Sequence, residues 1–467
     1  MKAIIHVLTI CSAVIASGMS VKAQAPDYLN RPMPERWEYT TDVQQTLPSD
    51  DKWWTLFEDA PLDTLISTVI DNNYNLRTAY HRMEIARQTI SQAAAQYYPT
   101  FSASAGYTNS RSAGAIRNSD TPSSNSSYFS LGVDMNWEID LFGKISSQVK
   151  NKKALYNASK ADYTATMVSL TAQATTYYIN LRTLQNKLAI AREHIESQGK
   201  VVKITEARYE AGLVSKLDVA QAKTIYCSTE VTIPQLEYSI RETINAIAIL
   251  MGVYPSEVPA SITEPRQQPA YTHLVATGVP MNLLRRRPDI MEAEYQLAAY
   301  AAQLGIAKKD FLPTLSLQGS VGVAAHKMGD MFKKNSFEYS IAPTLSWTMF
   351  DGFARKYAVA EAKEQMQIGI DNYNLTVMTA VQEVDNALKA YFTTLETIDR
   401  YVEGFGYSKE AFDLSIDQYT QGLSPFTNVV NAQIDWLNYA TSMAEARGNA
   451  LQALISLYKA LGGSPTE

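Results

Sequence analysis

Four stretches of this chain alternate between apolar and polar side chains, as β-strands do. In the clearest, which starts at Phe129, every second residue up to Ile139 is apolar and the residues between are small or polar. A similar run follows Tyr339, and weaker alternation precedes each of the two runs. The predicted strands are about 100–108, 128–140, 314–324 and 338–350, close to the roughly 9–11 residues of a tilted membrane-spanning strand.

One face of these strands is apolar enough to contact lipid. On that face we expect Phe129, Leu131, Val133, Met135, Trp137 and Trp347. Tryptophans near strand ends favour a membrane setting, because aromatic girdles lie at bilayer interfaces. Half-buried strands of a soluble sandwich would alternate in the same way, so that alternative stays open at this point.

Two other stretches follow the helical period and are unusually long. Apolar residues recur at three- and four-residue steps through about 144–210, and neither this stretch nor about 354–419 contains a proline. A helix of roughly 66 residues spans about 100 Å, so the two must lie in an elongated bundle. We expect return helices at about 216–250, kinked at Pro234, and 426–461, and shorter helices at about 62–97 and 280–310.

Three short motifs occur twice, in the same order. Residues 98–102 match 312–316, Trp137 matches Trp347, and residues 209–213 match 419–423, at offsets of 214, 210 and 210. Such ordered repetition predicts an internal duplication. The predicted divisions are a signal peptide 1–23, an extended segment 24–61, a first repeat 62–250, a connector 251–279, a second repeat 280–463 and a tail 464–467.

The N-terminus has the features of an export signal. Lys2 precedes a short apolar stretch, and Val21-Lys22-Ala23 fits a cleavage site after Ala23. The apolar stretch is short for an uncleaved membrane anchor. Lipidation at Cys11 is disfavoured because Ile10 occupies a position that requires a small residue. Cleavage leaves Cys227 as the single cysteine, which excludes an internal disulfide.

Composition and motifs argue against an enzyme. Lys and Arg number 41 against 47 Asp and Glu, a net charge of −6 without a long basic run, so nucleic acid is not an expected partner. No P-loop, nucleophile elbow or dinucleotide fingerprint appears, and we expect no catalytic residue, cofactor or metal. Weaker candidates are Asp218 as a catalytic carboxylate and His326-x-Met328-x-x-Met331 as a soft-metal site. We interpret Arg285 to Arg287 as a helix boundary before Pro288.

Four strands are too few to close a membrane barrel, which needs about eight or more. An open sheet edge cannot face lipid, because each unpaired backbone group there costs several kcal/mol. If the strands are in a membrane, the chain must therefore oligomerise, with each subunit donating four strands. A wide barrel continued by long helices would form a conduit through a membrane and an aqueous compartment.

Several motifs together resemble the outer-membrane factors, the TolC- and OprM-like channels of bacterial efflux pumps. The similarity covers almost the whole mature chain, and the last two motifs resemble the branch that serves resistance-nodulation-division pumps. The motifs are Trp53-Trp54-x-x-Phe57-x-Asp59, Leu284-x-Arg286-Arg287-Pro288-Asp289-Ile290, Tyr209-x-x-Gly212 with Asp218-Val219, Ile233-Pro234-x-Leu236, and Leu457-Tyr458-Lys459-Ala460-Leu461-Gly462-Gly463.

The resemblance implies a mixed α+β membrane protein that assembles as a homotrimer. Its twelve strands would form one β-barrel in the outer membrane, and its helices one periplasmic tunnel. The implied function is that of a passive channel of a tripartite efflux system, which exports small molecules such as drugs and toxic compounds. The implied partners are a periplasmic adaptor, an inner-membrane pump and outer-membrane lipid. A duct for polypeptide secretion and a soluble periplasmic helical scaffold are the alternatives.

The resemblance also implies that the hairpin tips close the tunnel until a partner opens it. The helix hairpins turn at about Gly212 and Gly422, and the residues just beyond them are Asp218, Asn428 and Asn431. Several relatives carry acids in the second tip motif, where this chain has the two asparagines. We therefore expect Asp218 to supply the charge of the gate and the asparagines to add neutral hydrogen bonds.

Overall fold

The computed structural model describes residue 29 and residues 52–112, 124–269 and 286–463. Apart from residue 29, these residues belong to one unit, Met33–Glu467. The predicted signal peptide, Cys11, most of the segment 24–61, part of the connector and the tail lie outside the described residues. Among the helices that are described, none is both long and apolar enough to cross a membrane.

The four predicted strands are present and form one antiparallel sheet in the order β1-β2-β3-β4. The bounds are β1 Thr100–Ser112, β2 Ser124–Ile139, β3 Thr314–Ala325 and β4 Phe337–Ser346. The first hairpin is longer than predicted, and β4 is shorter. Strand β4 ends at Ser346 because Ser346 pairs with Thr314, the first residue of β3, so Trp347 has no ladder partner and lies just beyond the strand.

Helices make up most of the described chain. The two longest, α4 and α9, have 67 residues each and match the ranges that the helical period predicted. The helices are α2 Ala60–Asn72, α3 Tyr74–Ala94, α4 Lys144–Glu210, α5 Lys216–Met251, α6 Ala260–Thr263, α8 Pro288–Lys309, α9 Ala354–Thr420 and α10 Phe426–Ala460, with short 3₁₀ turns at Trp53–Phe57, Ala95–Tyr97, Pro255–Glu257, Met328–Asp330 and Lys334–Ser336.

The single helix predicted at about 62–97 is wrong, because the chain breaks at Asn73. The backbone of Asn73 is extended, and its side chain accepts hydrogen bonds from the amides of Asn75 and Leu76, which caps α3. The Asn73 amide also donates to the carbonyl oxygen of Leu250 over 2.8 Å. This contact joins the break to the end of α5, so a long-range partner stabilises the break.

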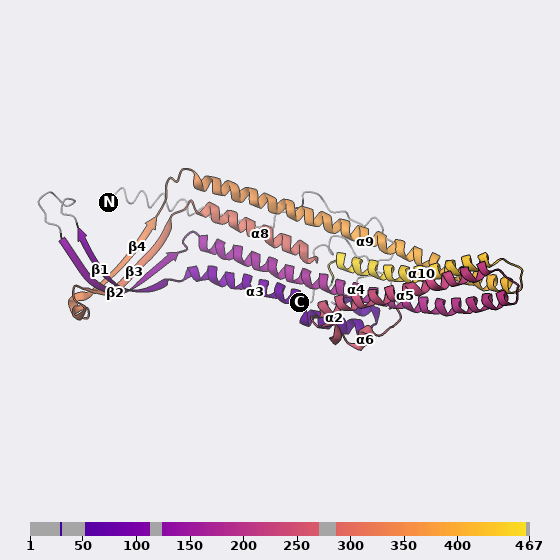
Figure 1. Cartoon of the computed structure of the whole chain (residues 1–467). Coiled ribbons are helices and arrows are strands. Elements are labelled where there is room, and N and C mark those ends of the chain that lie inside the picture. The colour runs from indigo at the N-terminus through magenta and orange to yellow at the C-terminus, as the bar shows by residue number, and fades with distance from the viewer. Residues whose placement is uncertain (1–28, 30–51, 113–123, 270–285, 464–467) are drawn as a thin grey trace. The chain divides into compact units, whose positions relative to one another are not determined.

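The helices that flank the sheet keep the neighbour order of the strands. Contacts join α3 to α4, α4 to α8 and α8 to α9, as pairing joins β1 to β2, β2 to β3 and β3 to β4 (Figure 1). Each of these helices directly precedes or follows one strand. The element order helix, strand, strand, long helix, return helix therefore occurs twice along the chain, and the two sets lie side by side.

The main hydrophobic core lies where the N-terminal turn and α2 pack on α4, α5 and α10. Trp53 stacks on Tyr458 of α10 with 5.3 Å between ring centroids. A fully buried arginine, Arg182, lies close to this core, and its guanidinium covers the Tyr178 ring at 4.5 Å. Its hydrogen bonds end on Gln185, on the Tyr178 hydroxyl and on the carbonyl oxygens of Ser261 and Glu264.

The arginine run before Pro288 is a helix boundary, as interpreted from sequence, with Arg287 as the N-cap residue of α8. Arg287 is buried and bonds Asp289, Glu383 of α9 and the carbonyl oxygen of Ala460. Burial opposes the charged form, yet the bonds to Asp289 and Glu383 raise the pKa of Arg287. The residue joins the start of α8 to α9 and to the end of α10.

Candidate functional site at the sheet face and the hairpin tips

The pairing register places apolar side chains of all four strands on one face of the sheet. Val133 of β2 pairs with Ala103 of β1 and Val321 of β3, and Val321 pairs with Tyr339 of β4. Because paired residues share a face and alternate residues return to it, the face can be listed from the ladder. It carries Phe101, Ala103, Ala105, Tyr107, Phe129, Leu131, Val133, Met135, Trp137, Leu317, Val321, Val323, Phe337, Tyr339, Ile341 and Leu345.

This apolar face is largely exposed within the single chain. Ile341 and Tyr339 are each 72% exposed, and Val133 is 41% exposed. An exposed apolar patch that extends over four strands is unusual for a surface in water and marks a contact with lipid or protein. The register thus brings together the predicted lipid-facing residues of β2, and adds residues of β1, β3 and β4 that we had not singled out.

The opposite face is polar and hollowed. Asp134 pairs with Ser102 and Ser320, and Asn136 pairs with Thr100 and Gln318. A cavity of about 290 Å³ lies over these residues, with Ser340 and Ala342 of β4 also in its wall. Small and polar side chains on a concave sheet face suit contact with water.

The two predicted interfacial tryptophans lie where strands join helices, and their indoles make matching contacts. The Trp137 indole donates to the carbonyl oxygen of Tyr97 over 2.9 Å. The Trp347 indole donates to the carbonyl oxygen of Phe311 over 3.0 Å. In each case the acceptor lies just before a strand, so the tryptophans tie the ends of the sheet to the preceding helical segments. An amphipathic ring with one satisfied polar atom is typical of a membrane interface.

The two hairpin tips have the same backbone geometry. Gly212 and Gly422 have φ values of +74° and +75°, a left-handed conformation that glycine adopts without steric cost. The amides of Gly212 and Leu213 donate to the carbonyl oxygens of Tyr209 and Arg208, and residues 422–423 repeat both bonds. These paired bonds are a Schellman motif, which ends each long helix and reverses the chain.

Within one chain, Arg208 links the first tip to the second. Its guanidinium donates to the carbonyl oxygen of Thr420, one of the last carbonyls of α9, which have no helical partner. The guanidinium also lies over the Tyr419 ring, 5.0 Å from the centroid. We call Arg208, Asp218, Tyr419 and Thr420 the tip cluster. Sequence reasoning missed Arg208, although a cation in the last turn of a helix is a recognisable sign of contact with carbonyl oxygens.

Asp218 belongs to the tip cluster through contacts inside its own chain. It accepts a 2.8 Å hydrogen bond from the Ser215 hydroxyl and lies half-buried in the first turn of α5. Burial and the neighbouring Asp218 carboxylate raise the pKa of the Tyr419 phenol, against the effect of Arg208. Asn428, the corresponding residue at the second tip, donates to the Ser424 hydroxyl, and Asn431 is exposed.

The residues of the weaker metal candidate have different surroundings. The ring nitrogen Nδ1 of His326 lies 2.6 Å from the carbonyl oxygen of Ser127, while Met328 is 70% exposed and Met331 is buried. Within residues 52–112, 124–269 and 286–463, no three His, Cys, Asp or Glu side chains are grouped as metal ligands.

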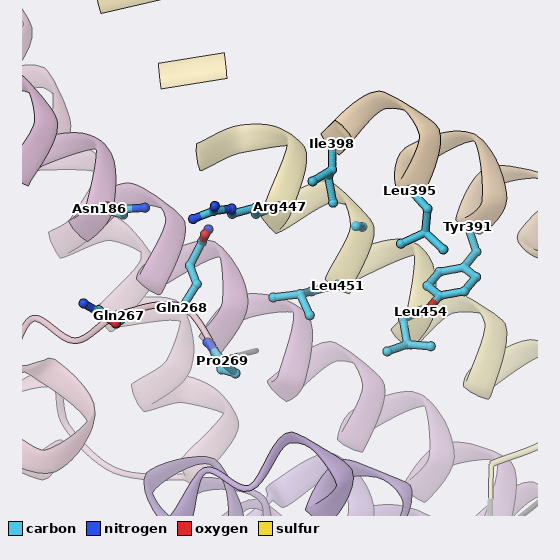
Figure 2. Close-up of a pocket in the computed structure, with 11 residues that line it drawn as sticks. Asn186, Gln267, Gln268, Pro269, Tyr391, Leu395, Ile398, Arg447, Leu451 and Leu454 are labelled. Atoms are coloured by element: carbon cyan, nitrogen blue, oxygen red, sulfur yellow. The ribbon is translucent and has the colours of Figure 1, made fainter. Parts of the chain in front are cut away.

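A cavity of about 550 Å³ opens between α4, α9, α10 and residues 267–269. Figure 2 shows Arg447 and Gln268 on the same side of this cavity, with Leu451 and Leu454 along α10. Among the described residues that line it, none is a carboxylate, a thiol or a histidine. The cavity is a groove beside the connector, lined by apolar side chains of α9 and α10 and by the amide side chains of Asn186, Gln267 and Gln268.

The family model described as "Outer membrane efflux protein" matches this chain twice, over residues 65–253 and 279–463. The two matches cover most of the chain, and the chain belongs to this family. It is an outer-membrane efflux channel, and the family is defined by transport rather than by a catalysed reaction. The recognition made from sequence motifs is confirmed.

Named relatives and solved structures agree with this assignment. The chain is 28% identical to Nodulation protein T of Rhizobium leguminosarum bv. viciae, over 94% of this chain and 90% of the relative. It is 27% identical to the toluene efflux pump outer membrane protein TtgC of Pseudomonas putida, over 97% and 94%. The structure of the outer-membrane channel OprN matches with a TM-score of 0.85 at 29% identity, over 93% of this chain and 98% of that chain.

A further match is the open state of the Neisseria gonorrhoeae MtrE outer membrane channel, with a TM-score of 0.81 and 26% identity. It covers 93% of this chain and 96% of that one. A soluble periplasmic scaffold is therefore no longer an alternative for this chain.

Proposed function

We propose that three copies of this chain close one twelve-stranded barrel in the outer membrane. The observation that carries the proposal is the sheet itself, which has an exposed apolar face and two edge strands, β1 and β4, without partners among the described strands. In lipid both edges must be paired, and four strands from each of three chains would pair them in a closed ring.

Native mass measurement in detergent tests the assembly. We expect the mature protein to appear as three chains, and the assembly to persist under detergent conditions that keep the β-sheet signal in circular dichroism. The physical reason is that barrel closure requires the edge strands of neighbouring chains to pair. A monomer that retains all of its β-sheet signal would contradict the proposal.

The proposed architecture has two duplicated halves, 62–250 and 280–463, joined by a connector and preceded by a cleaved signal peptide. The repeated element order and the double family match support the duplication. In the trimer, the polar sheet faces would line the barrel, and α4, α5, α9 and α10 would form the wall of a tunnel. In this proposal the barrel and the tunnel are an open path that catalyses no reaction, and transport through them is passive.

The proposed gate is the set of hairpin tips, which meet at the tunnel end when three subunits assemble. Each chain contributes Asp218, Asn428 and Asn431 beside the turns at Gly212 and Gly422. Arg208 supports closure, since it holds α9 against α4 through Tyr419 and Thr420. Opening would separate the second hairpin from the first and break these contacts.

Replacing Asp218 by asparagine should lower the cation preference of the channel by roughly twofold or more, because the trimer loses three carboxylates near the pore axis. The closed state should change modestly, since Ser215 and Tyr419 keep a polar neighbour. Reversal potentials in planar bilayers measure the selectivity. Glu230→Gln is the matched control, because Glu230 is exposed on the same helix, about three turns from Asp218, and should leave selectivity unchanged.

The converse change, Asn431→Asp, should raise cation preference and loosen the gate by like-charge repulsion. Equal selectivity in wild type, Asp218→Asn and Asn431→Asp would remove both residues from the pore. In that case Asp218 acts only within its own subunit, through the contacts with Ser215 and Tyr419.

The proposed partners are a periplasmic adaptor and an inner-membrane pump, and the proposed cargo is small molecules. The names of TtgC and related efflux proteins support small molecules over polypeptides. Leu213 is 66% exposed at the first tip and suits a photo-crosslinking residue. We expect crosslinking in the cell envelope to capture a periplasmic adaptor there, whereas capture of exported polypeptides inside the tunnel would favour a secretion duct.

A further inference from the structure

A buried polar seam lies between the first and second hairpins, about five helical turns from the tips. His194 of α4 is 1% exposed, and its ring lies 4.0 Å from the Trp436 ring of α10, centroid to centroid. Trp436 in turn stacks on Phe412 of α9 at 5.0 Å. The histidine is therefore buried at one end of a row of three aromatic rings that joins three helices.

The antiparallel register of α4 and α10 places two glutamines in the next turn of the seam. Lys187 of α4 contacts Glu445 of α10, and His194 of α4 contacts Trp436 of α10. Between these two contacts α4 advances by seven residues, and α10, which runs in the opposite direction, goes back by nine. One further turn brings Gln198 opposite Gln433. These two side chains are 1% and 2% exposed.

The polar atoms of the seam lack protein partners. Five are buried without a hydrogen bond: Nδ1 of His194, Nε2 and Oε1 of Gln198, Nε2 of Gln433 and Nε1 of Trp436. An unsatisfied buried polar group is destabilising, and native proteins usually satisfy it with protein or water. Five such atoms within two turns make this a weak stretch of the contact between α4 and α10.

No charged partner stabilises a protonated histidine here. Burial is the cause of the shift that lowers the pKa of His194 to about 4. The charged side chains at nearby positions of the surrounding helices are all exposed: Arg192, Glu193 and Glu196 of α4, Glu230 and Glu237 of α5, Glu403, Lys409, Glu410 and Asp413 of α9, and Asp435 of α10. Uptake of a proton therefore places a buried charge against the Trp436 ring without an anionic partner.

We propose that His194, Gln198, Gln433 and Trp436 form an acid-sensitive seam, which loosens when His194 takes a proton from water and lets the second hairpin move away from the first. In the loosened state, water reaches the two glutamine amides and the imidazolium. The seam acts on the contact between α4 and α10, whereas the tip cluster joins α4 and α5 to the end of α9. Both contacts hold the first hairpin against the second. Its effect on conductance rests on the proposed gate, but its effect on helix separation does not.

The direction of the pH dependence follows from the two pKa values. In the packed seam the pKa of His194 is about 4, and for a solvated histidine it is about 6.5. The packed state therefore keeps its full stability above pH 6.5 and loses stability as the pH falls toward 4. Between pH 7.5 and 5.0, linkage shifts the ratio of loosened to packed seam by up to about thirtyfold per subunit.

Spin labels at positions 187 and 445, in a Cys227→Ser background, measure the separation of α4 and α10 directly. We expect one short distance at pH 7.5 and a growing population at longer distance at pH 5.0. His194→Phe keeps a ring against Trp436 but cannot ionise, so it should hold the short distance at both pH values. His194→Gln is a second non-ionising variant should the first fail to fold, and His81→Phe, at an exposed position, should respond like wild type.

The same distances in wild type at both pH values would overturn the seam, and so would an acid response that His194→Phe retains. Conductance in planar bilayers provides the second readout. Acid should raise the open probability of wild type and not that of His194→Phe. A change in distance without a change in conductance would refute the link from seam to gate. A wild type that never conducts would count against the proposed channel and not against the seam.

Discussion

Arginine at position 133 should sharply reduce the amount of assembled protein in the outer membrane. Val133 lies in the middle of β2, on the apolar face, between Ala103 of β1 and Val321 of β3. A charged side chain that faces lipid near the bilayer midplane costs about 2–4 kcal/mol, and the cost applies once for each chain of the proposed trimer. The detergent-extracted, heat-sensitive oligomer on a gel measures the effect.

Arginine at position 134 is the matched control. Asp134 is the next residue of the same strand, but it lies on the polar face beside Ser102 and Ser320. Its side chain would enter water, so assembly should remain close to wild type while ion selectivity changes. Equal assembly of Val133→Arg and Asp134→Arg would show that the apolar face does not contact lipid.

Replacing Arg182 by methionine should lower the free energy of unfolding by at least about 3 kcal/mol. The side chain is fully buried, and its loss removes the donors that satisfy Gln185 and the carbonyl oxygens of Ser261 and Glu264. It also removes the donor to the Tyr178 hydroxyl, which itself donates to Asp59. Burial and the bond to Asp59 raise the pKa of Tyr178 to about 12, so the phenol stays neutral after the change.

Thermal unfolding in detergent measures this loss. Lys187→Met is the control, five residues along the same helix, because the contact of Lys187 with Glu445 is partly solvent-exposed and such pairs contribute about 1 kcal/mol or less. Similar shifts in the two variants would mean that the Arg182 network is not a main source of stability where the N-terminal segment and the residues after α6 pack on α4.

The strands and long helices could be predicted because their signals are local. Alternation with a period of two marked all four strands, and the uninterrupted helical period marked α4 and α9 to within about one residue at each end. The bounds of the strands were less accurate, since pairing sets where a strand ends. Strand β4 stops at Ser346 because its partner there, Thr314, is the first residue of β3. Residues 347–350 themselves give no sign of this limit.

The tip turns could also be predicted from nearby residues, because a glycine directly after a long helix adopts the left-handed conformation that ends the helix. The contacts among the tips were not visible. Asp218 could be placed near a turn, but its neighbour Tyr419 is about 200 residues away in sequence, and Arg208 was not singled out at all. The break at Asn73 was not predicted for the same reason, because the Leu250 carbonyl oxygen that accepts a hydrogen bond from the Asn73 side chain lies far away along the chain.

The sequence alone determined the element types, the two faces of each strand and the family, because periodicity and short motifs are properties of neighbouring residues. The tertiary structure decided which strands and helices meet, and in what register. That register brings the apolar residues of four strands onto one face and places Gln198 opposite Gln433, beside the ring contact of His194 with Trp436. Such pairings join residues that lie far apart along the chain, and they depend on packing between whole elements, which a one-dimensional pattern does not encode.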